Sequence, residues 1–251
     1  MSEKTVVVNL PLDEKQRKEL VRAGRDLNFV FLEDSSATAL VRAEVNAIIG
    51  PVPVDEIEAF PSLEWVHIPS AGAIHDDPET DLPIALAERG IRLTSAAGNG
   101  AVPLAEHAML LMIMLNRDAP RWLRAQSAHV WDRFVHEELA GKTVGIFGLG
   151  NIGSDLALKA RAFHMTVVGM RRNVDSRVPG VDKIYGPDEM EDFVSRCDFV
   201  VVTAPLTHET AGAFDETVFR AMKRTAFFVC VSRKMIAVDT ALLRALREGW
   251  I

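Results

Sequence analysis

The residues with the clearest chemical potential form a glycine-rich turn, Gly-Leu-Gly-Asn-Ile-Gly, that begins at Gly148. It follows an apolar strand pattern and precedes a helical one, the context in which such a turn binds a dinucleotide. Gly148 permits the tight turn, Gly150 lets the backbone approach a pyrophosphate, and Gly153 allows close packing of helix on strand. The helix that starts at Asn151 and Ile152 points its free amides at that anion. We predict a dinucleotide site; a strand–turn–helix joint without a ligand is the alternative.

The end of the next predicted strand bears on which dinucleotide binds. Proteins that prefer NAD usually carry an acidic residue there, which binds the adenosine ribose. This sequence has Arg171 and Arg172 instead, and the nearest carboxylate is Asp175. Two guanidinium groups suit a 2′-phosphate through charge-assisted hydrogen bonds. We predict NADP as the cofactor, with NAD as the second choice; a pair of solvated surface arginines is the alternative.

The turn lies in the second of two series in which strand and helix patterns alternate. The first series predicts elements at 5–10, 13–26, 29–32, 47–50, 54–60, 65–68 and 91–94, and the second at 143–147, 151–163, 165–170, 184–185, 188–196, 199–203, 214–222, 226–231 and 240–248. Strands interleaved with helices imply parallel pairing, with helices on both faces of each sheet. We therefore expect an α/β protein with two Rossmann-like or flavodoxin-like, doubly wound parallel-sheet domains.

A long apolar stretch, Val102–Trp122, separates the two series and predicts one long helix. Because it is apolar nearly all round, we expect it to be buried on several faces. Such burial suits a helix wedged between domains or between subunits.

Composition narrows the class of protein. The 251 residues are 48% hydrophobic and 25% charged, which excludes a disordered chain, a collagen-like repeat and a disulfide scaffold. A net charge of −7 argues against sequence-independent nucleic-acid binding. Cys197 and Cys230 lie in apolar contexts and are expected to be buried free thiols, and no Cys-x-x-Cys pair suggests a metal site. Without a signal-peptide pattern or membrane-spanning run, we expect a cytoplasmic protein without membrane or nucleic-acid partners.

Further motifs around the turn resemble those of the D-isomer-specific 2-hydroxyacid dehydrogenases. The resembling segments span 63–72, 102–107, 139–146, 205–210 and 231–243, so that the resemblance covers nearly the whole chain. The arginine pair is similar to that of the NADP-dependent glyoxylate/hydroxypyruvate reductase branch. The resemblance implies an oxidoreductase that transfers a hydride between NADP(H) and a small 2-keto or D-2-hydroxy acid. It also implies a homodimer formed through Val102–Trp122.

The same resemblance implies a division of labour along the chain. Residues 1–98 would form a substrate-binding lid domain, and residues 99–251 a dinucleotide-binding Rossmann domain that lacks its last strand. In the lid, the backbone amides of Ala71 and Gly72 would bind the substrate carboxylate. In the second domain, Arg233 would hold that carboxylate and polarise the 2-keto oxygen, a task that suits a planar guanidinium. An ordinary surface salt bridge is the alternative for Arg233.

The family's nicotinamide-side contacts transfer onto Pro205, Thr210 and Val231. One departure stands beside the catalytic arginine, where Lys234 replaces the usual glycine. We expect this larger cation either to narrow the site or to add a second contact to an anion.

The family's acid–base machinery does not transfer onto this sequence. It is a histidine oriented by a glutamate, both downstream of the arginine segment, whereas none of the seven histidines here follows Arg233. His208, in the loop expected near the nicotinamide, is the best-placed substitute, with a loop-surface histidine as the plainer interpretation. We expect a truncated enzyme sequence; a non-catalytic dinucleotide-binding sensor or interaction protein on the same fold is the alternative.

Overall fold

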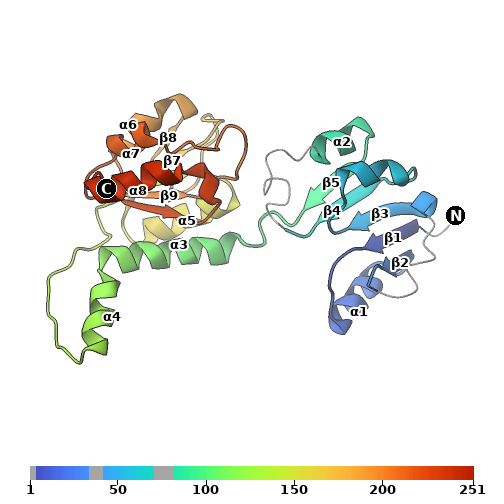
Figure 1. Cartoon of the computed structure of the whole chain (residues 1–251), viewed down its shortest axis with the longest axis horizontal. Helices are drawn as coiled ribbons and strands as arrows, with labels where there is room; N and C mark the ends of the chain where they lie inside the picture. Colours follow the sequence, from blue (N-terminus) through green and yellow to red (C-terminus); the bar gives the residue numbers. More distant parts are fainter. Residues whose placement is uncertain (1–3, 34–41, 71–81) are drawn as a thin grey trace. The chain divides into compact units, whose positions relative to one another are not determined.

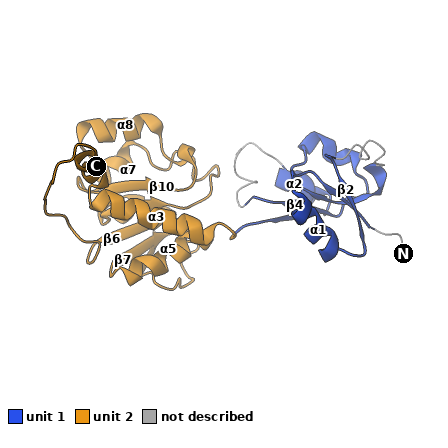
Figure 2. Cartoon of the chain, turned by 90° about the horizontal axis from the view of Figure 1, so that it is seen from below, with its two compact units in different colours: residues 1–97 blue, residues 98–251 orange. Residues whose placement is uncertain are grey.

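The chain contains two compact units, residues 1–97 and 98–251 (Figure 2). The computed structural model describes residues 4–33, 42–70 and 82–251. Each unit is built on a five-stranded sheet whose paired strands all run parallel. Within these described ranges, no helix has the length and apolar character needed to cross a membrane.

Unit 1 has the strand order β2-β1-β3-β4-β5 (Figure 1). Its elements are β1 (Lys4–Val8), α1 (Glu14–Ala23), β2 (Leu27–Phe31), β3 (Val45–Ile49), β4 (Trp65–Ile68), α2 (Leu82–Glu88) and β5 (Arg92–Ser95), with 3-10 turns at Arg42–Glu44 and Val54–Ala59. This is the flavodoxin-like order, in which the chain winds outward on both sides of the first strand. The core lies along the central strands, where Val7, Ile48 and Val66 are buried.

Unit 2 has the strand order β10-β9-β6-β7-β8. Its elements are α3 (Ala101–Asn116), α4 (Ala119–Ser127), β6 (Thr143–Phe147), α5 (Asn151–Ala162), β7 (Thr166–Met170), β8 (Lys183–Tyr185), α6 (Met190–Ser195), β9 (Phe199–Val202), α7 (Glu216–Ala221), β10 (Phe227–Cys230) and α8 (Asp239–Glu248), with 3-10 turns at Pro187–Glu189 and Lys234–Ile236. Counted within the unit, these are the first five strands of the Rossmann sheet in their usual order. The prediction of two doubly wound parallel α/β sheets is confirmed.

Helices cover both faces of the sheet in unit 2, and the pleat of β9 shows why. Side chains alternate between the two faces of a strand. Phe199 and Val201 therefore pack in the core shared with α3 and α5. Val200 and Val202 belong to the opposite core, under α6, α7 and α8. All four are fully buried, which explains why this strand reads as a continuous apolar run rather than an alternating one.

The prediction of one long helix over Val102–Trp122 is wrong. The structure has two helices, α3 and α4, and the break lies at Asp118, whose φ of 47° is left-handed. The side chain of Asp118 caps α4 by accepting a hydrogen bond from the backbone N–H of Arg121. Pro120, in the first turn of α4, is tolerated there because the amides of a first turn have no helical partner. Polar and charged residues, Asn116, Arg117 and Asp118, lie where the two helices meet, so the apolar pattern itself ends at this break.

The expectation that this stretch is buried on several faces is also only partly met. The small and flexible residues Ala105, Ala108 and Met112 of α3 are fully buried against α5 and the sheet. Leu110 lies on the other side of the helix and is exposed, and Val102, in the first turn, is exposed as well. A helix that packs on one face within its unit therefore carries apolar side chains on its free face.

The two cysteines differ, and the expectation that both are buried is wrong for one of them. Cys197 is fully buried, its Sγ donates to the Phe193 carbonyl at 3.1 Å, and burial raises the pKa of its thiol to about 12. Cys230 is exposed, although desolvation still raises its pKa. It is the last residue of β10, an edge strand, and its neighbour Val229 takes the inward position.

Candidate functional site

The predicted site residues of unit 2 lie on loops that leave the carboxyl ends of its strands. The glycine turn follows β6, the arginine pair follows β7, the Pro205–Thr210 loop follows β9 and Arg233 follows β10. Carboxyl ends of parallel strands share one edge of the sheet, and β6 and β9 are neighbours from which the chain winds in opposite directions. In open α/β sheets, such a switch point at the carboxyl edge is where ligands bind.

Gly148 lies at the switch point. Its φ of +104° is a left-handed conformation that favours glycine, and a Cβ there would stand 2.6 Å from the Ala204 backbone. The Gly148 amide donates to the Met170 carbonyl at 3.0 Å, and its carbonyl accepts from Thr203 Oγ1 at 2.5 Å. The turn is therefore bonded to the strands on both sides of β6.

Gly153 and Gly150 differ in how closely the surrounding atoms pack against them. A Cβ on Gly153 would lie 2.1 Å from the Gly148 carbonyl oxygen, so this position brings α5 against the strand. A Cβ on Gly150 would meet no atom of the described residues within 4 Å, so this position is open within the described part of the chain. Gly150 also begins α5 without any side-chain cap, which leaves the amides of the first turn, at Asn151 and Ile152, open to an anion. Asn151 is exposed, and Ile152 packs partly into the core.

The arginine pair divides into two environments. Arg171 is half-buried, and its backbone amide donates to the Tyr185 carbonyl at 3.2 Å, which anchors the residue to β8. No carboxylate among the described residues contacts its guanidinium. Arg172 is 80% exposed, and its Nη1 lies 3.4 Å from Oε2 of Glu209, in the loop after β9.

That loop is a compact turn closed by two threonines. Thr210 Oγ1 donates to the Pro205 carbonyl at 2.7 Å and accepts from the Thr207 amide at 2.8 Å. Leu206 is fully buried and ties the turn to the core, while Pro205 is exposed beside it. His208 is exposed at the tip of the turn. The sequence prediction named Pro205 and Thr210; the structure shows that Thr210 shapes the loop around Pro205.

Arg233 leaves the sheet on a turn that is fixed on both sides. The Val231 amide donates to the Val202 carbonyl at 3.2 Å, and Ser232 Oγ donates to the Ala204 carbonyl. After the arginine, the fully buried Ile236 anchors the chain again. Arg233 itself is half-buried, so its backbone is held while part of its side chain stays accessible at this edge.

The predicted substrate contacts of unit 1 are only partly visible. Ala71 and Gly72 lie outside the described residues. The strand that precedes them in the sequence, β4, carries a polar cluster in which Trp65 Nε1 donates to Thr94 Oγ1 at 2.9 Å, and His67 Nδ1 lies 2.9 Å from the same oxygen. This shared hydroxyl joins the neighbouring strands β4 and β5 close to the predicted carboxylate loop.

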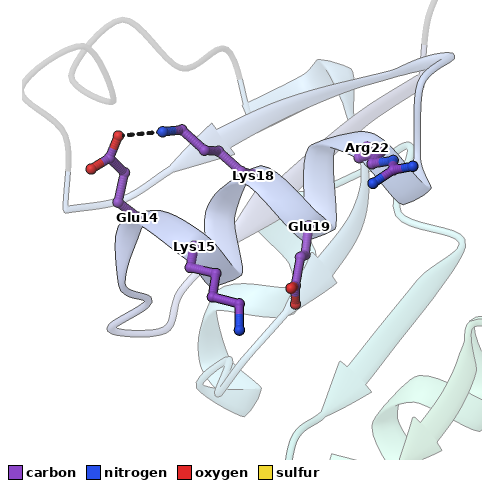
Figure 3. Close-up of a pocket in the computed structure, with 5 residues that line it drawn as sticks. All are labelled: Glu14, Lys15, Lys18, Glu19 and Arg22. Carbon is purple, nitrogen blue, oxygen red and sulfur yellow. Dashed lines mark hydrogen bonds and ion pairs between the residues drawn. The ribbon is translucent and has the colours of Figure 1, made fainter.

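A hollow lies on the solvent face of α1 in unit 1 (Figure 3). Its lining consists of charged side chains from this single helix, which are Glu14, Lys15, Lys18, Glu19 and Arg22. Glu14 and Lys18 form an ion pair of 2.6 Å one helical turn apart. Charges of both signs on one exposed helix are typical of a solvated surface, so we place no site here.

Three residues of the site were missed by sequence reasoning. Thr203 and Ser232 follow β9 and β10 and bond the Gly148 and Ala204 carbonyls, and Glu209 contacts Arg172. Thr203 and Ser232 could have been found from the sequence, because each is a hydroxyl residue within two positions of the end of an apolar strand. The contact of Glu209 carries no local signal, because it joins loops 37 positions apart.

We compared the chain with known protein families and with individual relatives. The family model described as "D-isomer specific 2-hydroxyacid dehydrogenase, NAD binding domain" matches residues 109–251. Among relatives, a glyoxylate reductase of Korarchaeum cryptofilum is 32% identical over 218 residues, covering 83% of this chain and 63% of the relative. A D-3-phosphoglycerate dehydrogenase of Methanocaldococcus jannaschii is 30% identical over 199 residues, covering 78% of this chain and 37% of the relative. The chain thus spans between about a third and two thirds of these relatives.

Solved structures show the same fold. An NADPH-dependent glyoxylate/hydroxypyruvate reductase of Sinorhizobium meliloti, in complex with NADP and sulfate, matches with a TM-score of 0.81 at 23% identity, covering 99% of this chain and 79% of that one. A D-isomer specific 2-hydroxyacid dehydrogenase family protein of Aeromonas salmonicida matches with a TM-score of 0.81 at 24% identity, covering 99% and 79%. The family model covers more than half of the chain, and the fold agrees with it. The chain belongs to the D-isomer-specific 2-hydroxyacid dehydrogenase family.

Proposed function

We propose that the protein to which this chain belongs transfers a hydride between NADP(H) and a small 2-keto or D-2-hydroxy acid, of the glyoxylate or hydroxypyruvate kind. The observation that carries the proposal is the carboxyl edge of the sheet in unit 2. There the open space at Gly150 and the uncapped start of α5 lie on the same edge as Arg171 and Arg233. Family membership and the named activities of the relatives support the same reaction class.

The cofactor would be held by backbone at its centre and by cations at its adenosine end. The amides at Asn151 and Ile152 would bind the pyrophosphate, aided by the positive end of the α5 dipole. Arg171 and Arg172 would bind the 2′-phosphate through charge-assisted hydrogen bonds. The nicotinamide end would lie toward the loops after β9 and β10, at Pro205, Thr210 and Val231. Bound NADPH would supply the hydride.

Arg233 would orient the substrate. A guanidinium presents a planar fork of donors that matches a carboxylate or the edge of a 2-keto acid. Donating to the keto oxygen draws electron density from C2, the carbon that receives the hydride, and stabilises the charge that develops on that oxygen. The family resemblance implies that the backbone amides of Ala71 and Gly72 would bind the remaining carboxylate oxygens. Lys234, exposed directly after Arg233, adds positive charge at this end of the site.

We further propose that the protein is a homodimer that uses the region around α4. Figure 1 shows α4 standing away from the sheet of unit 2. The segment that follows it exposes alternate side chains, and Trp131 and Val135 are 89% and 98% exposed. Trp122 and Leu123 on α4 are exposed as well. Large apolar side chains gathered on one projection mark an association surface, and a second copy of the chain is the expected partner.

Gly150→Ala separates dinucleotide binding from folding. The added methyl group meets no atom of the described residues within 4 Å, so the thermal midpoint should stay within about 2 °C of wild type. It fills the space of the pyrophosphate, and losing one charge-assisted bond should weaken NADPH binding about 10-fold or more in calorimetry. Gly153→Ala is the contrast, because its Cβ meets the Gly148 carbonyl and should destabilise the fold by about 1–3 kcal/mol. Unchanged NADPH affinity in Gly150→Ala would contradict the site.

Arg171→Asp tests the choice of cofactor. Replacing a phosphate-binding cation by a ribose-binding carboxylate should raise the dissociation constant for NADPH by about 10- to 150-fold and improve that for NADH. Arg177→Asp is the matched control, because it makes the same charge change on an exposed residue of the following loop. A wild-type protein that prefers NADH would overturn the NADP assignment.

Arg233→Gln tests the reaction. NADPH consumption with glyoxylate or hydroxypyruvate should fall by about 100-fold or more in kcat/KM, because a bidentate charged contact to the substrate is lost. Calorimetric affinity for NADPH should change by less than about twofold, since no cofactor contact is removed. A wild-type chain that binds NADPH but turns over neither acid would favour a non-catalytic dinucleotide-binding protein instead.

Light scattering tests the dimer. The proposal requires a mass twice the 27.7 kDa of one chain. Trp131→Asp should shift the population toward monomer, since it places a charge at the centre of the apolar projection. Leu246→Asp, on the exposed face of α8, should leave the mass unchanged. A wild-type monomer at working concentrations would count against the proposal.

A further inference from the structure

The ion pair between Arg172 and Glu209 joins loops from two different strands. Arg172 Nη1 and Glu209 Oε2 lie 3.4 Å apart, and the side chains are 80% and 66% exposed. Arg172 follows β7, and Glu209 belongs to the loop after β9. In the sheet, β6 lies between these two strands. The pair therefore spans the carboxyl end of β6, where the glycine turn begins.

The carboxylate is not carried by a loose loop. The turn around it is closed by hydrogen bonds between Thr207 and Thr210, including a 2.8 Å bond from the Thr207 amide to Thr210 Oγ1. The fully buried Leu206 fixes the start of the turn. The backbone of Glu209 is therefore held by the turn around it, and not only by the ion pair that its side chain forms with Arg172. A negative charge is held beside one of the two cations that would receive a phosphate.

The two arginines are unequal in this respect. Arg171 contacts no carboxylate among residues 4–33, 42–70 and 82–251, whereas Arg172 already has a partner. A 2′-phosphate arriving at Arg172 must displace the Glu209 carboxylate or lie next to it. If the phosphate displaces the carboxylate, the ion pair is lost; if the two groups lie side by side, their negative charges repel each other. Either outcome opposes a ligand that carries the 2′-phosphate and leaves one without it unaffected.

We propose that Glu209 competes with the 2′-phosphate for Arg172 and thereby limits the preference of the site for NADP(H) over NAD(H). This makes Glu209 a specificity-determining residue that contacts Arg172. The inference rests on the proposed function, since it requires a dinucleotide at the glycine turn with its adenosine end at the arginine pair. Arg171 binds the phosphate without competition from Glu209. Arg172 adds less to the affinity for the phosphate, because binding there costs its ion pair with Glu209.

Binding of adenosine fragments to the full chain tests the competition directly. The probes are 2′,5′-ADP, which carries the 2′-phosphate, and 5′-AMP, which lacks it, measured by calorimetry at one low ionic strength. Glu209→Gln should tighten 2′,5′-ADP binding about two- to fivefold, the range that an exposed ion pair supports. Binding of 5′-AMP should stay within about 1.5-fold, because its phosphate lies at the glycine turn rather than at Arg172.

Two comparisons make the result specific. Glu138→Gln removes the same charge from an exposed residue next to the start of β6, at the other edge of the sheet, and should change neither affinity. In an Arg172→Gln background, Glu209→Gln should have no further effect on 2′,5′-ADP, because the contested cation is gone.

The outcomes separate this inference from the proposed function. If wild type binds neither fragment, the dinucleotide site itself is wrong. If wild type prefers 2′,5′-ADP but Glu209→Gln leaves that affinity unchanged, the competition is overturned. Weaker 2′,5′-ADP binding in Glu209→Gln also overturns it, because Glu209 would then orient Arg172 toward the phosphate. An effect that persists in the Arg172→Gln background shows that Glu209 acts through another contact and overturns the proposal as well.

Discussion

The close approach of β6, β9 and α5 around two glycines is the constraint on which the rest of unit 2 depends. No Cβ fits at Gly148, which lies against the Ala204 backbone, or at Gly153, which lies against the Gly148 carbonyl. Thr203 Oγ1 secures the same point by donating to that carbonyl at 2.5 Å. Because helix and strands meet so closely, the first turn of α5 starts at the carboxyl edge of the sheet, at the point where its winding reverses.

The positive charge at the carboxyl edge of the unit 2 sheet comes from a few nearby groups. The chain carries a net charge of −7, so its overall field does not favour anionic ligands. Arg171, Arg172 and Arg233 nevertheless all follow strand ends at the carboxyl edge of one sheet, and the α5 dipole adds positive potential there. Glu209 offsets part of this charge at Arg172. The local charge at this edge is therefore set by the placement of a few side chains rather than by the charge of the whole protein.

The errors of sequence reasoning have definite physical causes. The predicted helix extends across the polar residues Asn116, Arg117 and Asp118, and the backbone turns left-handed at Asp118 and divides it. Apolar neighbours suggested burial for Cys230, but its position at the end of an edge strand leaves it exposed. Periodicity describes which side chains can share a face, whereas burial also depends on what packs against that face. The contact between Arg172 and Glu209 was invisible because it joins two loops that are 37 positions apart in the chain.

The sequence by itself determined the alternation of strands and helices, the parallel character of both sheets and the glycine turn at Gly148, because these follow from local periodicity and from the conformations that glycine alone adopts readily. Only the tertiary structure decided which loops share an edge, that Gly153 is packed while no described atom lies within 4 Å of a Cβ on Gly150, and that Arg172 is paired whereas Arg171 contacts no carboxylate among the described residues. These features depend on strand order and on contacts between residues distant in the chain, which local patterns do not encode.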